Sequence, residues 1–338
     1  MRSLLFSSWQ IGTTGVFVMI ESKVCAGIDL GGTKIAVLLG RLNGEIVGYE
    51  KIETRSVEGP EQAFQRVVSS LKKLSEESGY GFDAIGLGVP GLADPKSGTI
   101  EFLPNLPGSW NGFPAGKYLG ELSGRAVQVM NDARLAAIGE FYFGSETPRP
   151  NLLVVTLGTG IGGGLILDGK LRLGECGAAG EIGHHTILPD GVACSCGSNG
   201  CLETLINGRQ LNAAGIELAR QGKAPRLVEL VAGNLEAISP REMAQAAEQG
   251  DTHVGDAIET AARYLGIGIA NAVSITAVPE VVLCGGVALM GELLLKPVRE
   301  EIEKRVRMFP ASHVRVSCST LGEKVGALGA LALAFHPV

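Results

Sequence analysis

The chain has 338 residues, of which 45% are hydrophobic and 19% charged, and its formal net charge is −6 at pH 7. This length and composition, with 49 glycines, indicate a soluble α/β enzyme with two buried cores and many tight turns. A mildly acidic chain with no concentrated basic segment is not expected to bind nucleic acid. No apolar run reaches membrane-spanning length without interruption, so no membrane partner is expected either.

The first eighteen residues begin with a basic residue and an apolar patch, a weak sign of a secretory signal. Polar residues from Ser7 to Thr14 interrupt the patch, and no A-x-A cleavage site follows. We therefore expect residues 1–23 to be a flexible N-terminal extension, with the true start near Met19.

Apolar runs and turn signals predict strands that carry the glycine turns, followed by a more helical second half. A hairpin signal stands at Asn43-Gly44, and a helix is expected to start after Ser239 as cap with Pro240 in the first turn. The predicted strands are Val24–Leu30, Ile35–Leu39, Ile46–Thr54, Phe82–Val89, Ala126–Met130, Leu152–Leu157, Leu165–Leu167, Glu280–Leu283 and Val314–Cys318, and the predicted helices include Pro60–Ser75, Ala133–Phe143, Asp251–Ala277, Ala288–Met308 and Glu323–Phe335.

A strand-turn-strand unit occurs twice, about 125 residues apart. Asp29-Leu-Gly-Gly-Thr33 in the first copy corresponds to Thr156-Leu-Gly-Thr-Gly160 in the second. Two glycine hairpins in one chain also arise by chance, but the shared order of elements favours a duplication. The sequence therefore predicts two related lobes, each offering a glycine turn to a shared cleft.

The hexapeptide Asp29–Lys34 (DLGGTK) is typical of a phosphate-binding turn. Its two glycines let backbone N–H groups approach an anion, and its threonine hydroxyl adds a donor. Asp29 stands at the end of a buried strand, where it could orient Mg²⁺ through water. An ordinary hairpin with a solvated lysine is the alternative, and the second glycine turn at residues 158–160 argues against it.

Other glycine-rich segments match nucleotide-binding patterns in part. Gly158–Gly163 fits G-x-G-x-x-G, but that fingerprint needs a helix after the turn, and a strand is expected there. Gly164–Leu171 resembles a Walker A loop, but Leu171 replaces the hydroxyl residue that would bind magnesium. The segment 284–287 (CGGV), at a strand-to-helix junction, could let an adenine ring lie against the backbone; a plain tight turn is the alternative.

Three of the seven cysteines lie within eight residues and follow a histidine. His184, Cys194, Cys196 and Cys201 form the series H-x9-C-x-C-x4-C, whose three thiolates and one imidazole complete a closed tetrahedral zinc site. A closed site indicates structural Zn²⁺, and a metal-free loop of reactive thiols is the alternative. The remaining cysteines are expected to be small buried residues, which suits a reducing, cytoplasmic environment.

Carboxylates flank the expected zinc site. Glu181 lies three residues before His184 and Glu203 two residues after Cys201, so a metal-stabilised loop could present them to a polyhydroxylated ligand. If His184 binds zinc through one ring nitrogen, the other can bond a sugar hydroxyl. For each glutamate alone, a solvated surface charge is the alternative.

Asn131-Asp132 ends the strand Ala126–Met130 and precedes the helical pattern Ala133–Phe143. A helix cap explains this dipeptide. A carboxylate at the end of a strand, facing a cleft between lobes, is also where a kinase needs its general base.

Together, Asp29–Lys34, the segment 181–184 (EIGH) and the segment 194–203 (CSCGSNGCLE) resemble the ROK family (repressors, open-reading-frame proteins and kinases), and within it bacterial glucokinases. The similarity runs from about Val24 to the C-terminus. It implies an α/β, two-lobe actin-like ATPase (ribonuclease H-like) fold with a duplicated βββαβα core and a zinc knuckle over residues 184–203. The implied small lobe is residues 24–132 joined by the C-terminal helix 322–338, the large lobe is residues 133–321, and the implied assembly is a homodimer or homotetramer.

The resemblance also implies ATP-dependent phosphorylation of a hexose, expected to be glucose, at its 6-hydroxyl, with Asp132 as general base and Mg²⁺ as the catalytic ion. The residues implied to bind the sugar are Gly91, Asn105, Asn131, Asp132, Glu181, His184 and Glu203. Those implied to bind the nucleotide and its magnesium are Asp29, Gly31, Gly32, Thr33, Lys34, Gly158, Thr159, Gly160, Gly285, Gly286 and Val287. Cys284 departs from the family pattern, where glycine is commoner, and this puts the adenosine contact in doubt.

Other functions stay open. A sugar-sensing ROK regulator without catalysis would carry a winged-helix domain ahead of the first phosphate strand, and 23 residues precede Val24 here. An actin-like chaperone or filament protein would share the nucleotide lobes but has no use for the zinc knuckle and its glutamates. The C-x-C-G-x-x-G-C spacing favours glucokinase, but N-acetylmannosamine kinase and fructokinase remain alternatives because pocket shape sets substrate choice.

Overall fold

The computed structural model describes residues 23–103, 106 and 109–337; the first 22 residues of the expected extension and Asn105 therefore lie outside the described part. The chain divides into two compact units, Met1–Met130 with Ala330–Val338, and Asn131–Gly329. The sequence placed the boundary after residue 132 and assigned all of residues 322–338 to the first unit. The residues of the last helix, α10 (Val325–Phe335), are divided between the two units after Gly329.

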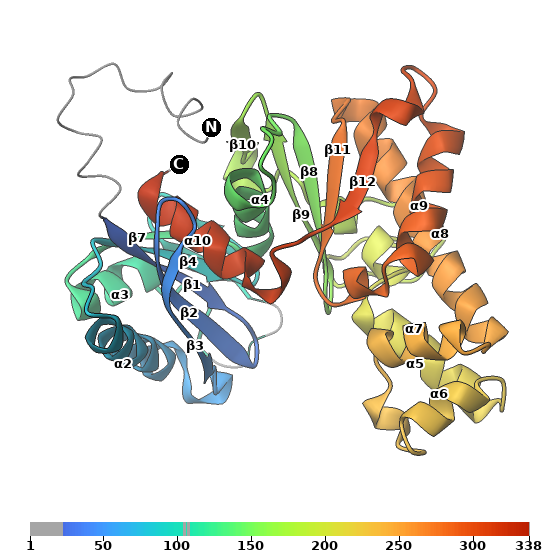
Figure 1. Cartoon of the computed structure of the whole chain (residues 1–338), viewed down its shortest axis with the longest axis horizontal. Helices are drawn as coiled ribbons and strands as arrows, with labels where there is room; N and C mark the ends of the chain where they lie inside the picture. Colours follow the sequence, from blue (N-terminus) through green and yellow to red (C-terminus); the bar gives the residue numbers. More distant parts are fainter. Residues whose placement is uncertain (1–22, 104–105, 107–108, 338) are drawn as a thin grey trace. The chain divides into compact units, whose positions relative to one another are not determined.

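The first unit is built on a five-stranded sheet in the order β3-β2-β1-β4-β7 (Figure 1). Its first three strands form the predicted antiparallel meander, and β4 pairs with β1 in parallel. The strands are β1 (Val24–Leu30), β2 (Lys34–Arg41), β3 (Ile46–Glu53), β4 (Ala84–Val89) and β7 (Ala126–Asn131).

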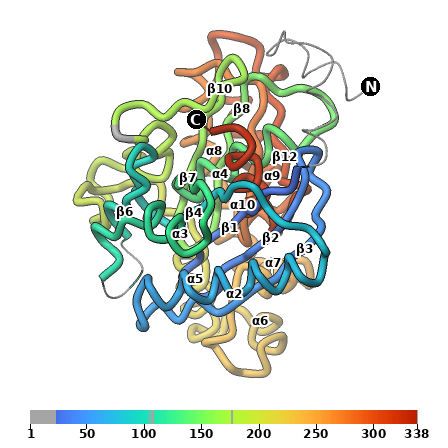
Figure 2. The backbone as a smooth tube through the Cα atoms, turned by 90° about the vertical axis from the view of Figure 1, so that its left-hand side faces the viewer, coloured from blue at the N-terminus to red at the C-terminus, as the bar shows by residue number. Residues whose placement is uncertain are grey.

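Helices cover both faces of this sheet. Helix α2 (Pro60–Ser78) runs along β2 and β3 (Figures 1 and 2), and Gly48 of β3 leaves room for Leu74 of α2. On the other face, a Cβ atom at Gly86 would lie 1.9 Å from the carbonyl oxygen of Ala330, so glycine is what admits α10. Helix α3 (Ala115–Ser123) and the hairpin of β5 (Leu92–Asp94) with β6 (Thr99–Phe102) were not predicted, because runs this short carry little periodicity.

The second unit has a sheet of the order β10-β9-β8-β11-β12, which matches the first sheet strand for strand. Strands β8, β9 and β10 are antiparallel, and β11 and β12 continue in parallel from β8. The strands are β8 (Leu152–Leu157), β9 (Ile161–Leu167), β10 (Lys170–Arg172), β11 (Glu280–Cys284) and β12 (Arg315–Cys318).

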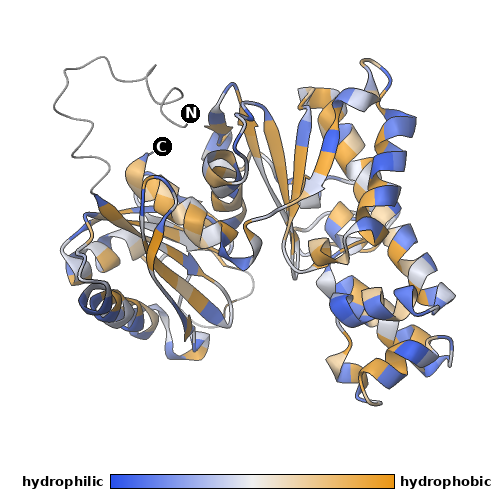
Figure 3. Ribbon diagram, in the orientation of Figure 1, coloured by the Kyte–Doolittle hydropathy of each residue, from blue (hydrophilic) through white to orange (hydrophobic). Residues whose placement is uncertain are grey.

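Alternation along the strands of this sheet divides its apolar side chains between two faces, and the strands are predominantly hydrophobic (Figure 3). One set packs in the core that includes α8 (Thr252–Thr276) and α9 (Glu292–Arg305): Leu153, Val155, Val281 and Leu283. The other set packs with α4 (Asp132–Phe143): Leu152, Val154, Val282 and Cys284. Helices α5 (Gly208–Arg220), α6 (Pro225–Leu230) and α7 (Pro240–Glu248) form a further group, and Ser239 caps α7 as predicted.

Two predicted boundaries in this unit were wrong for physical reasons. Strand β9 starts at Ile161 and not at Leu165, because the intervening glycines allow α4 to pack against it; a Cβ atom at Gly164 would lie 2.4 Å from the Cβ of Ala137. Helix α9 starts at Glu292 and not at Ala288, because Gly291, at φ 60°, ends a preceding 3-10 turn. None of the helices described in this chain is long and apolar enough to cross a membrane.

Candidate functional site

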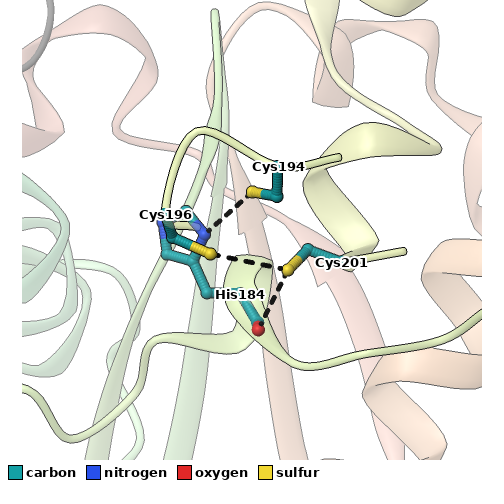
Figure 4. Close-up of side chains that lie close together, drawn as sticks. All are labelled: His184, Cys194, Cys196 and Cys201. Carbon is teal, nitrogen blue, oxygen red and sulfur yellow. Dashed lines mark hydrogen bonds between the residues drawn. The ribbon is translucent and has the colours of Figure 1, made fainter. Parts of the chain in front are cut away.

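The four predicted metal ligands lie together in the second unit (Figure 4). His184 ends a short 3-10 helix (Ile182–His184), and the cysteines lie on the loop that follows it. The four ligand atoms lie within 4.8 Å of one another; His184 Nδ1 is 3.6 Å from Cys194 Sγ, and Cys196 Sγ is 3.7 Å from Cys201 Sγ. Within residues 23–103, 106 and 109–337, no other group of such side chains gathers in this way.

Backbone geometry and burial both shape this loop. Gly200 has φ 62°, and a Cβ atom there would lie 1.5 Å from the Leu188 carbonyl oxygen, so only glycine fits. Burial raises the pKa of the Cys201 thiol to about 12. A hydrogen bond with the backbone of Ser198 lowers the pKa of the Cys196 thiol. A bound cation would supply the positive charge that makes the thiolate form of Cys201 favourable at neutral pH.

The second ring nitrogen of His184 faces Glu181. His184 Nε2 lies 4.0 Å from Glu181 Oε2, while Nδ1 is directed to the cysteine cluster. Glu181 Oε1 accepts a hydrogen bond of 2.7 Å from Nη2 of Arg134, a side chain that is only 2% exposed. One carboxylate oxygen of Glu181 is thus held by a buried cation, and the other faces the imidazole.

Asn131 and Asp132 stand at the start of α4. Asn131 Oδ1 accepts hydrogen bonds from the backbone N–H groups of Ala133 and Arg134, so the predicted cap role is confirmed for Asn131. Asp132 Oδ1 accepts from Asn131 Nδ2 at 3.0 Å and from Ala133 N at 2.8 Å. These bonds fix the Asp132 carboxylate in the first helical turn, where the helix dipole favours a negative charge.

Glu203 joins the predicted sugar residues to the second glycine turn. Its Oε2 atom accepts a hydrogen bond of 2.7 Å from the backbone N–H of Ile161. A Cβ atom at Gly160 would lie only 2.3 Å from this oxygen, so the contact requires glycine. The start of α5 is tied to the same turn, because Gly208 N donates to Gly158 O at 2.8 Å.

The turn predicted to bind adenosine, Gly285–Val287, lies beside the end of β8, which leads into the predicted phosphate turn at residues 158–160. Gly285 has φ 93°, and a Cβ atom there would lie 2.4 Å from the Leu157 carbonyl oxygen. The two turns therefore follow neighbouring parallel strands, β8 and β11, at the edge where ligands bind α/β sheets. Cys284 is buried in the cluster that includes α4, whereas the next two residues, Gly285 and Gly286, are exposed and Val287 is buried.

In the first unit, the turn at Asp29–Lys34 is held by backbone and side-chain bonds. Gly31 N donates to Lys34 O at 3.0 Å, and the buried Thr54 donates from Oγ1 to Gly31 O at 2.7 Å. Burial raises the pKa of Asp29 to about 6. Gly91 has φ 139° and leaves no room for a side chain, because a Cβ atom would lie 2.3 Å from Phe102 O.

The predicted residues thus form two groups, one in each unit, and two supporting residues were missed. The sequence pattern places Arg134 only within the predicted helix Ala133–Phe143, although it is a charged residue three positions after Asn131 among buried neighbours. It places Thr54 only at the end of a predicted strand. The charge of Arg134 inside an apolar helix was a signal that could have identified it.

The matching sheets and their glycine turns define the class of protein, an α/β two-domain actin-like ATPase fold. The ROK family model matches residues 25–336, and the chain belongs to the ROK family. The family resemblance drawn from the sequence is therefore confirmed.

Relatives with named functions are similar to this chain over most of its length. A glucokinase of Halalkalibacterium halodurans is 34% identical over 307 residues, which is 90% of this chain and 92% of the relative. A xylose repressor of Caldicellulosiruptor bescii is also 34% identical, over 91% of this chain and 77% of the repressor. The solved ROK family glucokinase from Streptomyces griseus, in complex with glucose and AMPPNP, is 34% identical with a TM-score of 0.81, covering 92% of this chain and 99% of that one.

Proposed function

We propose that the protein transfers the γ-phosphoryl group of ATP to the 6-hydroxyl of a hexose, with glucose as its substrate. The contact between Glu203 Oε2 and Ile161 N, at 2.7 Å, carries the proposal, because it joins a sugar-binding carboxylate to a phosphate-binding turn. Phosphoryl transfer needs acceptor and donor side by side, and positioning supplies most of the catalysis. The glucose and AMPPNP complex of the Streptomyces griseus relative supports both ligands.

Glu181 and His184 would bind one sugar hydroxyl between them. With Nδ1 directed to the cysteines, Nε2 carries the proton and donates, whereas Glu181 Oε2 accepts. A hydroxyl oxygen about 2.8 Å from both atoms fits the 4.0 Å that separates them. Asn131 and Glu203 of the same unit would bind further hydroxyls of the sugar.

Asp132 would take the proton of the 6-hydroxyl as it attacks the γ-phosphorus. The first turn of α4 packs on β9 just after the glycine turn, since a Cβ atom at Gly162 would lie 2.6 Å from the Ala133 Cβ. The carboxylate of Asp132 therefore lies in the same region of the unit as residues 158–160. An aspartate at this position acts as the base that accepts the proton of the hydroxyl.

Backbone groups would hold the nucleotide: in the second unit, residues 158–160 would bind its phosphates and residues 285–287 its adenosine. In the first unit, the turn at residues 31–33 would also bind phosphate, and Asp29 would orient Mg²⁺ through water. The matching strand orders of the two sheets support the further proposal that the units are duplicated copies, each contributing one phosphate turn.

We also propose that His184, Cys194, Cys196 and Cys201 hold a structural Zn²⁺ ion. Zinc bonds of about 2.3 Å to sulfur and about 2.05 Å to nitrogen place tetrahedral ligands about 3.8 Å apart for two sulfurs and about 3.6 Å apart for sulfur and nitrogen. The separations of 3.7 Å and 3.6 Å in the cluster fit these values. The ion would fix the His184 ring and the loop that leads to Glu203.

The test is ADP release from Mg²⁺-ATP in the presence of glucose, mannose, fructose, N-acetylglucosamine or N-acetylmannosamine, with identification of the phosphorylated product. Turnover is expected on glucose, with glucose 6-phosphate as product. Preference for an N-acetylated sugar would keep the mechanism and change the substrate. Sugar binding without turnover on any sugar would overturn the kinase proposal in favour of a sugar-sensing regulator.

Replacing Asp29 by Asn is expected to raise the stability of the protein and to lower its activity. Its pKa is about 6 in the folded protein against an ordinary value of 3.8, so the stability that it contributes below about pH 4 is lost as the pH rises through 6. We expect Asp29→Asn to raise the melting temperature at pH 7.5, by on the order of 5 °C for about 1–2 kcal/mol, because part of the carboxylate stays exposed. Phosphorylation should fall, because the amide holds magnesium poorly.

Thermal unfolding of both proteins at pH 4 and pH 7.5 checks this prediction. The two melting temperatures should converge at pH 4, where both side chains are neutral. An equal difference at both pH values would show that the Asp29 carboxyl titrates alike in the folded and unfolded chains.

A further inference from the structure

Arg134 is a buried cation whose side-chain hydrogen bonds go to two of the proposed sugar residues. It sits in the first turn of α4 with only 2% of its side chain exposed. Nη2 donates to Glu181 Oε1 at 2.7 Å, Nη1 donates to Asn131 Oδ1 at 3.2 Å, and Nε has no hydrogen-bond partner among the described residues. Nothing in the family resemblance assigned a role to this residue.

Stability alone does not account for this charge. Removing a guanidinium from water costs several kcal/mol. Its partner Glu181 stays 39% exposed, so solvent screens the attraction that would offset this cost. The neighbouring α4 positions from Ala133 to Glu140 are all buried, and most are apolar, so an apolar side chain would suit the helix. The Nε group left without a partner adds to the cost.

The contacts of Arg134 link the two ends of the proposed sugar site. Asn131 accepts from Arg134 through Oδ1 and donates through Nδ2 to Asp132 Oδ1. A continuous series of hydrogen bonds therefore runs from Glu181 through Arg134 and Asn131 to Asp132. Because Arg134 occupies Oε1 of Glu181, it leaves Oε2 directed at His184 Nε2, where a hydroxyl would bind.

We propose that Arg134 is a positioning residue, which orients the Glu181 carboxylate for a sugar hydroxyl and couples it through Asn131 to the general base. This inference rests on the proposed function. The planar guanidinium suits the task because its two terminal nitrogens bond two acceptors in a fixed geometry, which a lysine cannot do. Arg134 touches no reacting atom and acts through its two partners.

Steady-state kinetics of Arg134→Met and Arg134→Lys test the proposal. Arg134→Met is expected to raise the KM for glucose and lower kcat, for a combined loss of about 10- to 100-fold in kcat/KM, with the KM for ATP within about twofold of the wild type. Arg134→Lys should recover part of the loss, because it keeps the charge near Glu181. If the methionine variant does not fold, the lysine variant still tests the proposal. Its KM for glucose should then change more than its KM for ATP.

Arg149→Met is the matched control. The side chain of Arg149 is only 10% exposed and donates to the buried Glu140 in the same unit, but it hydrogen-bonds none of the proposed sugar residues. It should lower the melting temperature without changing the KM for glucose. An equal rise in the KM for glucose in both methionine variants would overturn the proposal, because a general loss of stability would then explain it.

A double-mutant cycle provides a second test. If Arg134 acts through Glu181, the effect of Arg134→Met should shrink to less than about fivefold in a Glu181→Gln background. Independent, multiplicative effects would contradict the coupling. If the wild type phosphorylates sugar and the cycle shows no coupling, this inference alone is refuted. If the wild type neither binds nor phosphorylates any sugar, the proposed function is refuted as well.

Discussion

Replacing Asp132 by Asn is expected to lower kcat for glucose by about 10²- to 10⁴-fold, the range that a general base contributes. The amide keeps the shape of the side chain and an oxygen that can accept the bonds from Asn131 Nδ2 and Ala133 N. It cannot accept the proton of the attacking hydroxyl. The KM values for glucose and ATP should change much less than kcat, because the loss falls on the transition state.

The measurement is ADP release at saturating Mg²⁺-ATP, with glucose binding followed by calorimetry. Asp168→Asn is the matched control: Asp168 lies in the hairpin between β9 and β10 at φ 55°, a conformation that asparagine tolerates, and its side chain is 83% exposed. The control should keep wild-type turnover. A modest loss of kcat in Asp132→Asn, of threefold or less, would remove Asp132 from the role of base.

Loss of the metal cluster is expected to have the second large effect. Cys201→Ala removes a fully buried ligand, and a three-ligand site should release its Zn²⁺ during purification against a chelator. The loop from residue 186 to residue 201 would then lose the link that holds its cysteines to His184. We expect kcat/KM for glucose to fall by at least about 10²-fold, because His184 and Glu203 flank this loop and would lose their fixed positions.

Metal content by mass spectrometry of the purified protein, limited proteolysis of the loop and sugar kinetics check this prediction together. One zinc per chain is expected in the wild type and in the control Cys25→Ala, whose thiol is buried in β1 outside the cluster. The variant at Cys201 should contain little metal and be cleaved within the loop. Full activity in a metal-free variant would show that the cluster does not support the sugar site.

The sequence predicted the elements whose signals are local and strong. Strand β1 has the predicted bounds, and α8 begins and ends within one residue of the prediction. Both elements are marked by regularly spaced or continuous apolar residues with turn residues at their ends. Strand β9 was predicted too short because glycines are usually a sign of turns. Here Gly162 and Gly164 are strand residues, and only the approach of α4 explains why they have no side chain.

The metal cluster shows the same strength of local signals. The four side chains proposed to hold the ion lie in one short stretch of the chain, so their spacing alone predicted that they would gather, and the loop's glycines allow the backbone to fold around them. The family motifs also lie in short segments, each of which can be identified without knowing what surrounds it. Those segments were sufficient to identify the family that the comparisons confirm.

Only the tertiary structure determines which partners the site residues contact. Arg134 and Glu181 are 47 positions apart and Glu203 and Ile161 are 42 apart, and no spacing rule joins residues at such distances. Ligand series, caps and turns depend on backbone geometry within a few residues, which the sequence determines directly. An ion pair between the buried Arg134 of α4 and the exposed Glu181 of a distant loop depends instead on how whole elements pack. This packing decides which surface charges predicted from the sequence become fixed parts of a site.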